Sequence, residues 1–328
     1  AGFSERVLEQ KQAFIERYEP ASDYWKQHDA AQSPEVMQQV QRHLRDVAHH
    51  YHALAQQQNK PKNYVEAGRW YRLYLNSFPE SGQAPLMNFL YAELLTGSGQ
   101  HGLAATQYER TAYSYGQHEK AAEAGYAALL AYQKHEPTLK GRGKAEWHRA
   151  GINSALQFAG RFPEHKQALP VRTLAAQQLY ALAEYAAAIA AARPVIENPA
   201  ASKDLQLSAW MVVAHAQFDL EDYQNAETAY QQVLARSGRK DEQYGKLQEK
   251  LAATIYKQGE QEKQAGNLSG AAEHFLRIAD TVPASSVNVT AQYDAAAAFI
   301  ALKQWPDAIA VLERWRRSNP EHKLEADV

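Results

Sequence analysis

The stretch LSAWMVVAHAQFDLEDYQNAETAYQQVLA, residues 207–235, decides the fold of this chain. In its first half, apolar or small side chains recur every three or four positions, at Leu207, Trp210, Val213, Ala214 and Ala216. This is the period of an amphipathic helix with one buried stripe. A short turn and a second helical segment follow, so the stretch predicts two antiparallel helices.

A spacing of twelve residues between two small side chains supports this helix pair. Ala214 lies in the first helix and Ala226 lies twelve residues later in the second. Two antiparallel helices joined by a tight turn come closest where both side chains are small, and larger residues such as Trp210 and Tyr230 fill the gaps between pairs.

The same landmarks recur about seven times along the chain. In most copies, a small residue of the second helix is followed four residues later by a larger residue, and often eight residues further by a proline, which cannot donate the next helical hydrogen bond. The third set departs from this spacing, and the set that begins at Ala187 is a smaller, weaker copy. The landmark sets are Ala67–Tyr71–Pro79, Ala104–Tyr108–Gly116, Gly151–Phe158–Pro163, Ala187–Ala191–Pro199, Ala226–Tyr230–Gly238, Ala271–Phe275–Pro283 and Ala308–Leu312–Pro320. The first-helix partners twelve residues earlier are Ala55, Ala92, Ala175, Ala214, Gly259 and Ala296. The third set is preceded by an inserted segment, HEPTLKGRGK, which we interpret as a loop.

These positions resemble the tetratricopeptide repeat family, whose pattern is W-x2-L-G-x2-Y, then A-x3-F, then P. Trp210, Val213 and Ala214 followed by Ala226 and Tyr230 are the best match, and the resemblance extends from about residue 36 to the end. It implies an all-α, right-handed α-α superhelix of about seven helix pairs over residues 36–328. Residues 1–35, with the amphipathic segment VLEQKQAFIERY, are expected to cap this array.

The resemblance also indicates a cellular setting. Long helices and turns such as FPES and RFPEH resemble the extracytoplasmic branch of the family, which includes outer-membrane assembly and cell-division coordinator lipoproteins of Gram-negative bacteria. A periplasmic or outer-membrane-associated location is therefore expected, with the cytoplasm as the alternative. The chain begins with Ala-Gly and ends in a polar string, so we expect it to be a piece of a longer polypeptide.

Composition argues against several kinds of partner. The net charge is −2, from 35 basic and 37 acidic residues, which leaves no basic surplus to neutralise nucleic-acid phosphates. There is no cysteine, so disulfides and thiolate metal sites are excluded. No apolar run approaches the length of about 18 residues that a membrane span needs.

Motifs that would carry chemistry are also missing. His43, His49, His50 and His52 cluster on one helix, but only His49 and His52 have the spacing of a metal-binding pair, so we interpret the cluster as a solvated helix face. The segment GRGK, residues 141–144, lacks the first glycine and the Ser/Thr of a phosphate-binding loop. We therefore expect no enzymatic activity, cofactor or metal.

The expected function is protein binding. By the family resemblance, the first helix of each pair lines the concave face of the superhelix at the positions that flank its small residue. The residues at those positions are His52, Gln56, Phe89, Glu93, Arg172, Met211, His215, Tyr256, Glu260 and Tyr293. A protein–protein interaction scaffold binding a partner protein or peptide on this face, in a bacterial envelope complex, is the main hypothesis. The alternative is a structural subunit or spacer region of a larger multi-repeat protein, without independent ligand binding.

Overall fold

The computed structural model describes residues 4–238 and 243–319. The chain divides into two compact units, residues 1–168 and 169–328, and each is described by itself. In the residues described, all regular structure is helical and no strand occurs, as predicted. The division into residues 1–35 and 36–328 stays a prediction.

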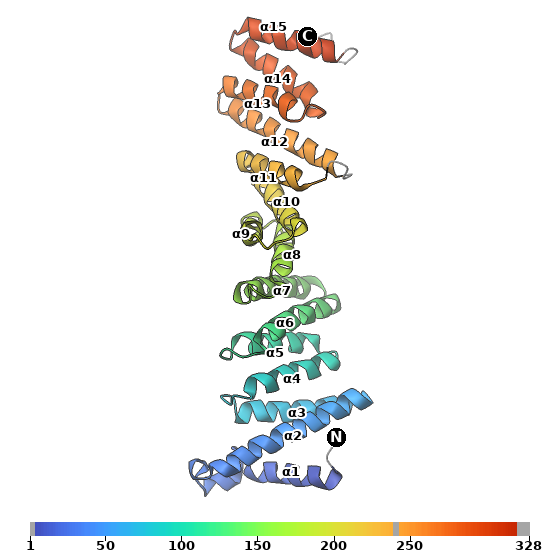
Figure 1. Cartoon of the computed structure of the whole chain (residues 1–328), viewed down its shortest axis with the longest axis vertical. Coiled ribbons are helices and arrows are strands. Elements are labelled where there is room, and N and C mark those ends of the chain that lie inside the picture. The colour runs from blue at the N-terminus through green and yellow to red at the C-terminus, as the bar shows by residue number, and fades with distance from the viewer. Residues whose placement is uncertain (1–3, 239–242, 320–328) are drawn as a thin grey trace. The chain divides into compact units, whose positions relative to one another are not determined.

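The N-terminal unit is a stack of helices in which each packs against the next (Figure 1). Its α-helices are α1 (Glu5–Tyr18), α2 (Pro34–Gln58), α3 (Pro61–Ser77), α4 (Ala84–Gly97), α5 (His101–Tyr113), α6 (Ala121–His135) and α7 (Gly141–Arg161). Short 3-10 helices are η1 (Asp23–Lys26), η2 (Ala30–Gln32) and η3 (Glu136–Thr138).

The C-terminal unit repeats this organisation. Its helices are α8 (Ala168–Ala181), α9 (Tyr185–Glu197), α10 (Lys203–Asp219), α11 (Tyr223–Arg236), α12 (Tyr244–Gln264), α13 (Leu268–Thr281), α14 (Val287–Ala301) and α15 (Trp305–Ser318). Three pairs in the first unit (α2–α3, α4–α5, α6–α7) and four in the second (α8–α9 to α14–α15) account for the described helices apart from α1. The predicted all-α array of about seven helix pairs is confirmed.

The turn inside five of the pairs has one shared geometry. A residue with positive φ closes each first helix: Gly99, Ala183, Glu221, Gly266 or Lys303. The next backbone N–H then donates to the carbonyl five residues before it, as Asp222 N–H does to Gln217 O at 2.9 Å. The left-handed residue turns the chain so that this 6→1 hydrogen bond can satisfy one of the last helical carbonyls, which explains why the turns are short.

Small residues hold the two helices of a pair together. A Cβ atom added to Gly259 of α12 would lie 2.5 Å from Cε1 of Phe275 in α13, so only glycine fits there without a shift. Ala214 and Ala226, like Ala296 and Ala308, are buried at the corresponding places.

Two predicted landmarks need correction. Ala187 is only half-buried, whereas its neighbour Ala188 is fully buried and lies four residues after the turn residue Glu184, as Ala226 does after Asp222. In the third pair, Gly125 of α6 is the residue that packs on Phe158, because a Cβ there would lie 2.9 Å from that ring. Gly151 lies instead against Tyr132.

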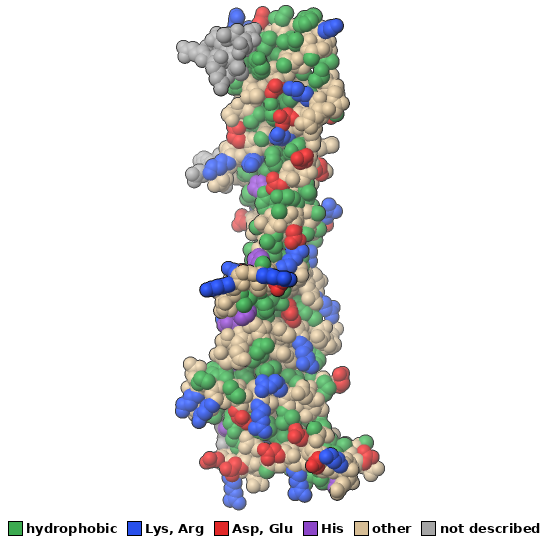
Figure 2. All heavy atoms as spheres, turned by 180° about the vertical axis from the view of Figure 1, so that it is seen from behind, with side chains coloured by type: hydrophobic (Ala, Val, Ile, Leu, Met, Phe, Trp, Pro, Cys, Tyr) green, Lys and Arg blue, Asp and Glu red, His purple; other side chains and the backbone are tan. Residues whose placement is uncertain are grey.

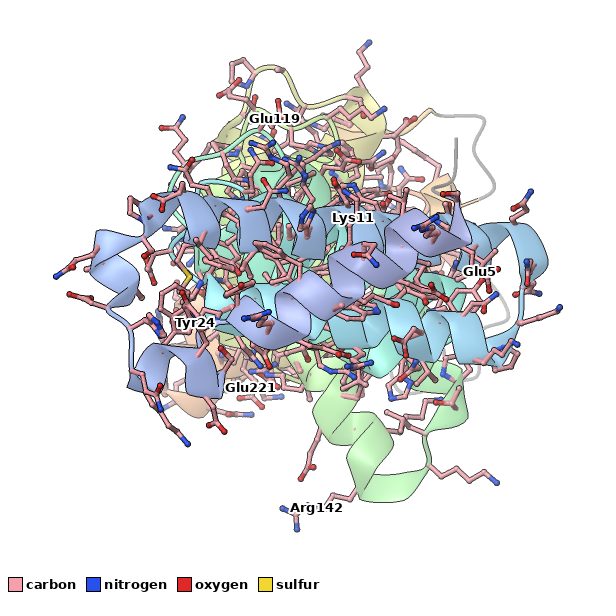
Figure 3. All side chains as sticks on the ribbon, turned by 90° about the horizontal axis from the view of Figure 1, so that it is seen from below. Glu5, Lys11, Tyr24, Glu119, Arg142 and Glu221 are labelled. Atoms are coloured by element: carbon pink, nitrogen blue, oxygen red, sulfur yellow. The ribbon has the colours of Figure 1, made fainter. Side chains whose placement is uncertain are left out.

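The predicted loop at residues 141–144 is also wrong, since Gly141–Arg161 form α7. Arg142, in its first turn, points away from the other helices (Figure 3) and pairs with Glu146 one turn later at 2.6 Å. The insertion before it forms η3 and lengthens the helix pair.

The N-terminal helix α1 packs on α2. Ile15 is fully buried there, and Lys11 reaches from α1 toward α2 (Figure 3), where its Nζ lies 2.5 Å from Asp46 Oδ2. The ion pair and the buried isoleucine fix this helix to the first pair.

Candidate protein-binding face

The first helices of the C-terminal unit carry a connected set of polar and aromatic side chains. Tyr180 of α8 donates a hydrogen bond to Oδ2 of Asp219 in α10, at 2.7 Å. The His215 ring lies between the rings of Tyr180 and Tyr230, with centroids 5.9 and 5.7 Å away. Side chains from three helices thus hold the imidazole in place.

A second connection joins α12 and α14. Tyr256 donates to Oδ2 of Asp294 at 2.6 Å, and its ring lies 5.0 Å from that of Phe275. Lys263 approaches the other oxygen of Asp294 at 4.0 Å, and Glu260 pairs with Lys257 at 2.5 Å. The aromatic and charged groups here are held by partners on neighbouring helices.

The ionisation of these groups follows from their surroundings. Burial, and secondarily the charge of Lys250, lowers the pKa of His215 despite the opposing charge of Asp219. Burial and the hydrogen bond to Asp219 raise the pKa of Tyr180 to about 12, and burial and the bond to Asp294 raise that of Tyr256. At neutral pH this face therefore presents a neutral imidazole and neutral phenols.

The remaining predicted residues of this unit are partly accessible. Met211, His215, Tyr256, Glu260 and Tyr293 are half-buried. Arg172 of α8 is half-buried too, and burial lowers its pKa.

In the N-terminal unit, two predicted site residues face the core instead. His52 is only 6% exposed and shares a 2.9 Å hydrogen bond between its Nδ1 and the Tyr71 hydroxyl, and Phe89 is only 4% exposed, against Tyr108. Neither offers a partner much surface. Gln56 and Glu93 are exposed. Partial desolvation of the Glu93 carboxylate, and to a lesser extent the nearby charge of Glu123, raises the pKa of Glu93.

The histidine cluster on α2 behaves as separate residues. Burial, and to a lesser extent His49, lowers the pKa of His52 to about 4, so it is neutral at physiological pH. His43 instead lies near Lys11 and Gln39, at 3.4 and 2.7 Å. Within residues 4–238 and 243–319, no group of three or more His, Asp or Glu side chains is arranged to hold a metal ion.

Sequence reasoning missed Tyr180, Asp219 and Asp294. The two Tyr–Asp hydrogen bonds join residues 39 and 38 positions apart, and no local pattern marks such pairs. It also missed a buried cluster between α11, α12 and α13. There, Arg277 donates two hydrogen bonds to Glu227, at 2.6 and 2.7 Å, and Gln258 donates a third at 2.6 Å.

An apolar face of α15 lies uncovered in the described part of the chain. Ile309, five residues past the N-cap, is 56% exposed, and Trp305 is 55% exposed. At the same position of α5, α11 and α13, the residues Ala105, Glu227 and Ala272 are buried, and these helices pack against the first helix of the following pair.

Charge and hydropathy place few limits on the surface. On the face drawn in Figure 2, basic and acidic side chains are interspersed. None of the helices described is both long and apolar enough to span a lipid bilayer.

Comparison with known protein families finds a match for the C-terminal part of the chain. Residues 248–328 match the model of YfiO, described as an outer membrane lipoprotein. No curated protein sequence matches the chain.

Among solved structures, BtubC (BKLC) from P. vanneervenii is similar at 15% identity, over 84% of this chain and 90% of its own, with a TM-score of 0.28. The TPR domain of P58(IPK) is similar at 14% identity over 98% and 96%, with a TM-score of 0.27. The Cut9–Hcn1 complex gives 14% identity over 93% and 57%, with a TM-score of 0.24. TM-scores this low do not single out any of these structures as a relative of the chain.

The landmark residues, the seven described helix pairs and the match of residues 248–328 agree with one another. The helix pairs of this chain form a tetratricopeptide-type repeat fold, and residues 248–328 match the YfiO family.

Proposed function

We propose that this chain is a protein–protein interaction scaffold that binds a partner protein or peptide along its first helices, the concave side of a tetratricopeptide superhelix, in a bacterial envelope complex. The observation that carries the proposal is the half-buried set Met211, His215, Tyr256 and Tyr293 on α10, α12 and α14. The proposal involves no reaction, cofactor or nucleic acid.

The chemistry of this set suits protein recognition. Aromatic and methionine side chains supply most of the energy at protein interfaces, since they bury large areas at a small entropic cost. Tyr256 is already held by Asp294, and His215 by two aromatic rings, so a partner would order few groups on binding.

The envelope setting is supported by the match of residues 248–328 to an outer membrane lipoprotein family. That segment contains α13, α14 and α15 and most of α12, and so includes Tyr256, Glu260 and Tyr293. The half-buried set therefore extends into the matched segment.

The test is affinity capture from a bacterial envelope extract with the chain as bait, read out by mass spectrometry. The first variant carries M211A, Y256A and Y293A. The control variant carries Q224A and E273A, two exposed positions on the second helices α11 and α13.

A partner that binds the parent chain and the control variant, but not the first variant, would support the scaffold. Far-UV circular dichroism must show equal helix content in all three. A partner retained by the first variant, or no specific partner, would refute binding on this face.

A second candidate, a structural subunit held permanently by a neighbouring polypeptide, is favoured by the uncovered apolar face of α15. Trp305 and Ile309 stand one helical turn apart and are both more than half exposed. Light scattering after size exclusion tests it. Association of the parent chain that is lost in W305S/I309S would favour this candidate, and a monomer at all concentrations would count against it.

A further inference from the structure

The pair α14–α15 exposes a group of apolar side chains. Of the eleven large hydrophobic side chains that are exposed in the described part of the chain, four lie between residues 300 and 309. They are Ile300 near the end of α14, Leu302 in the turn, and Trp305 and Ile309 in α15. Exposed apolar groups of this kind usually mark a surface that another molecule covers.

The repeat gives these residues counterparts in the pair α10–α11. The small residues Ala226 and Ala308 are buried at matching places, and the two pairs turn at residues with positive φ, Glu221 and Lys303. Both relations place matching residues 82 positions apart. The counterparts of Ile300, Trp305 and Ile309 are therefore Phe218, Tyr223 and Glu227.

All three counterparts are in contact with α12, the first helix of the next pair. Nζ of Lys250 lies 5.6 Å from the ring centroid of Phe218. Nε2 of Gln258 donates to the backbone carbonyl of Tyr223 at 3.4 Å and to the carboxylate of Glu227 at 2.6 Å. A helix therefore lies across this surface in the pair α10–α11, and the matching surface of α14–α15 has the position to receive one.

The chemistry of this surface differs between the two pairs. In α11 the carboxylate of Glu227 accepts a hydrogen bond from Gln258, whereas α15 has Ile309 at the matching position. A glutamine buried against Ile309 would lose that hydrogen bond, and an unpaired buried amide costs free energy. A helix that lies on α15 therefore needs an apolar residue where α12 has Gln258.

The buried stripe of α12 indicates the rest of the pattern. Leu247, Leu251, Thr254 and Gln258 are all buried, and their spacing places them on one side of the helix. A helix that replaces Gln258 by an apolar residue would carry a stripe at i, i+4, i+7 and i+11. This stripe extends over about three helical turns.

A second copy of this chain is a poor source of such a helix. In α1, Ile15 is fully buried, Leu8 and Phe14 are packed against the same core, and Glu5, Glu9 and Glu16 are among the exposed residues. The first helices α4, α6, α10, α12 and α14 already pack on the second helix before them. These helices would have to leave their own contacts to bind α15.

We propose that Ile300, Trp305 and Ile309 form a docking surface for an amphipathic helix of a partner protein. The helix has apolar residues at i, i+4, i+7 and i+11 and lies on α15 as α12 lies on α11, with its last apolar residue against Ile309. This inference rests on the second candidate function, and it names the kind of partner that would cover α15.

The test uses labelled peptides with the sequence of residues 244–264, titrated with the full chain and read out by fluorescence anisotropy. One peptide keeps Gln258, one carries Q258L and one carries Q258E. A lactam bridge on the exposed side holds all three helical, and circular dichroism must show equal helix content. The Q258L peptide should bind saturably, and the peptide with Gln258 should bind about tenfold more weakly.

Variants of the chain locate the surface. W305A/I309A should bind the Q258L peptide at least tenfold more weakly than the parent chain, as expected when two anchoring side chains are truncated. The control V65A/L103A removes two comparably exposed apolar side chains from α3 and α5 and should bind as the parent does.

A charge exchange tests the register of the docked helix. In I309K, the Q258L peptide should lose affinity and the Q258E peptide should regain it, because the lysine then faces a carboxylate. A helix docked in another register would not show this exchange. Since Ile309 is 56% exposed, the chain should keep its helix content in this variant, which circular dichroism checks.

The proposal is overturned if the Q258L peptide does not bind saturably, if W305A/I309A binds it as well as the parent chain, or if I309K does not prefer the Q258E peptide. Self-association of the parent chain that W305S/I309S abolishes, without peptide binding, would leave the second candidate standing and refute the partner helix. The variant M211A/Y256A/Y293A should bind the peptide normally, so binding on the first helices can fail separately.

Discussion

The change Gly259→Ala should destabilise the pair α12–α13, although alanine is the better helix former. The added Cβ would lie 2.5, 2.7 and 3.0 Å from three atoms of the Phe275 ring, which is only 1% exposed and packs on Tyr256. The ring therefore has little room to move away.

The magnitude follows from two opposing effects. Replacing glycine by alanine within a helix stabilises by about 1 kcal/mol. Overpacking a filled core costs about 1–3 kcal/mol, and contacts this short place the cost near the upper end. The expected net loss in the free energy of unfolding is about 2 kcal/mol.

Hydrogen exchange read by mass spectrometry is the suitable assay, because a repeat array can open one pair at a time. Peptides of α12 and α13 in G259A should lose protection by a factor of about thirty relative to the parent chain. Peptides of α2 and α3, in the other unit, should keep theirs.

The matched control is Gly245→Ala in the same helix, where nothing lies within 4 Å of the added Cβ. It should be neutral or slightly stabilising. Partial restoration of G259A by F275L would confirm the steric cause, and equal protection in G259A and G245A would refute the reasoning.

Three further predictions concern buried or half-buried polar groups. The pKa of His52 falls from 6.5 to about 4 on folding, so its neutral form contributes its full share to the free energy of unfolding above pH 6.5, and this share is lost as the pH falls toward 4. The variant H52Q should lessen the loss by about 2 kcal/mol at pH 5. Hydrogen exchange in α2 measures it. In R277A the carboxylate of Glu227 stays buried without its main partner, which should lower the free energy of unfolding by about 2 kcal/mol. The double variant R277A/E227Q should lose less, because no buried charge is left unpaired. Urea unfolding measures both. Glu249 accepts three hydrogen bonds from the turn before α14, so E249A should cost about 1–2 kcal/mol and speed exchange in α14 but not in α10.

The fold could be predicted because its signals are local. Helical periodicity and a twelve-residue spacing of small side chains are visible within one pair, as Ala214 and Ala226 show. The prediction failed where alanine is abundant. In EYAAAIAAAR any of several alanines satisfies the spacing, and only the structure shows that Ala188 is the buried one.

The candidate site was less predictable, since its contacts join distant segments. His52 and Phe89 occupy family positions that flank the small residue. They are nevertheless buried, because His52 hydrogen-bonds to Tyr71 and Phe89 packs against Tyr108. The partner of Tyr256 is Asp294, which lies 38 residues later on α14, and no local sequence pattern links the two.

The five turns with a left-handed residue show where the thermal stability of this array could be increased. Gly99 and Gly266 adopt positive φ without strain, whereas Ala183, Glu221 and Lys303 adopt it with a side chain, at about 1 kcal/mol each. All three side chains are exposed. Three single replacements by glycine would therefore raise the melting temperature of the C-terminal unit without altering a packed side chain.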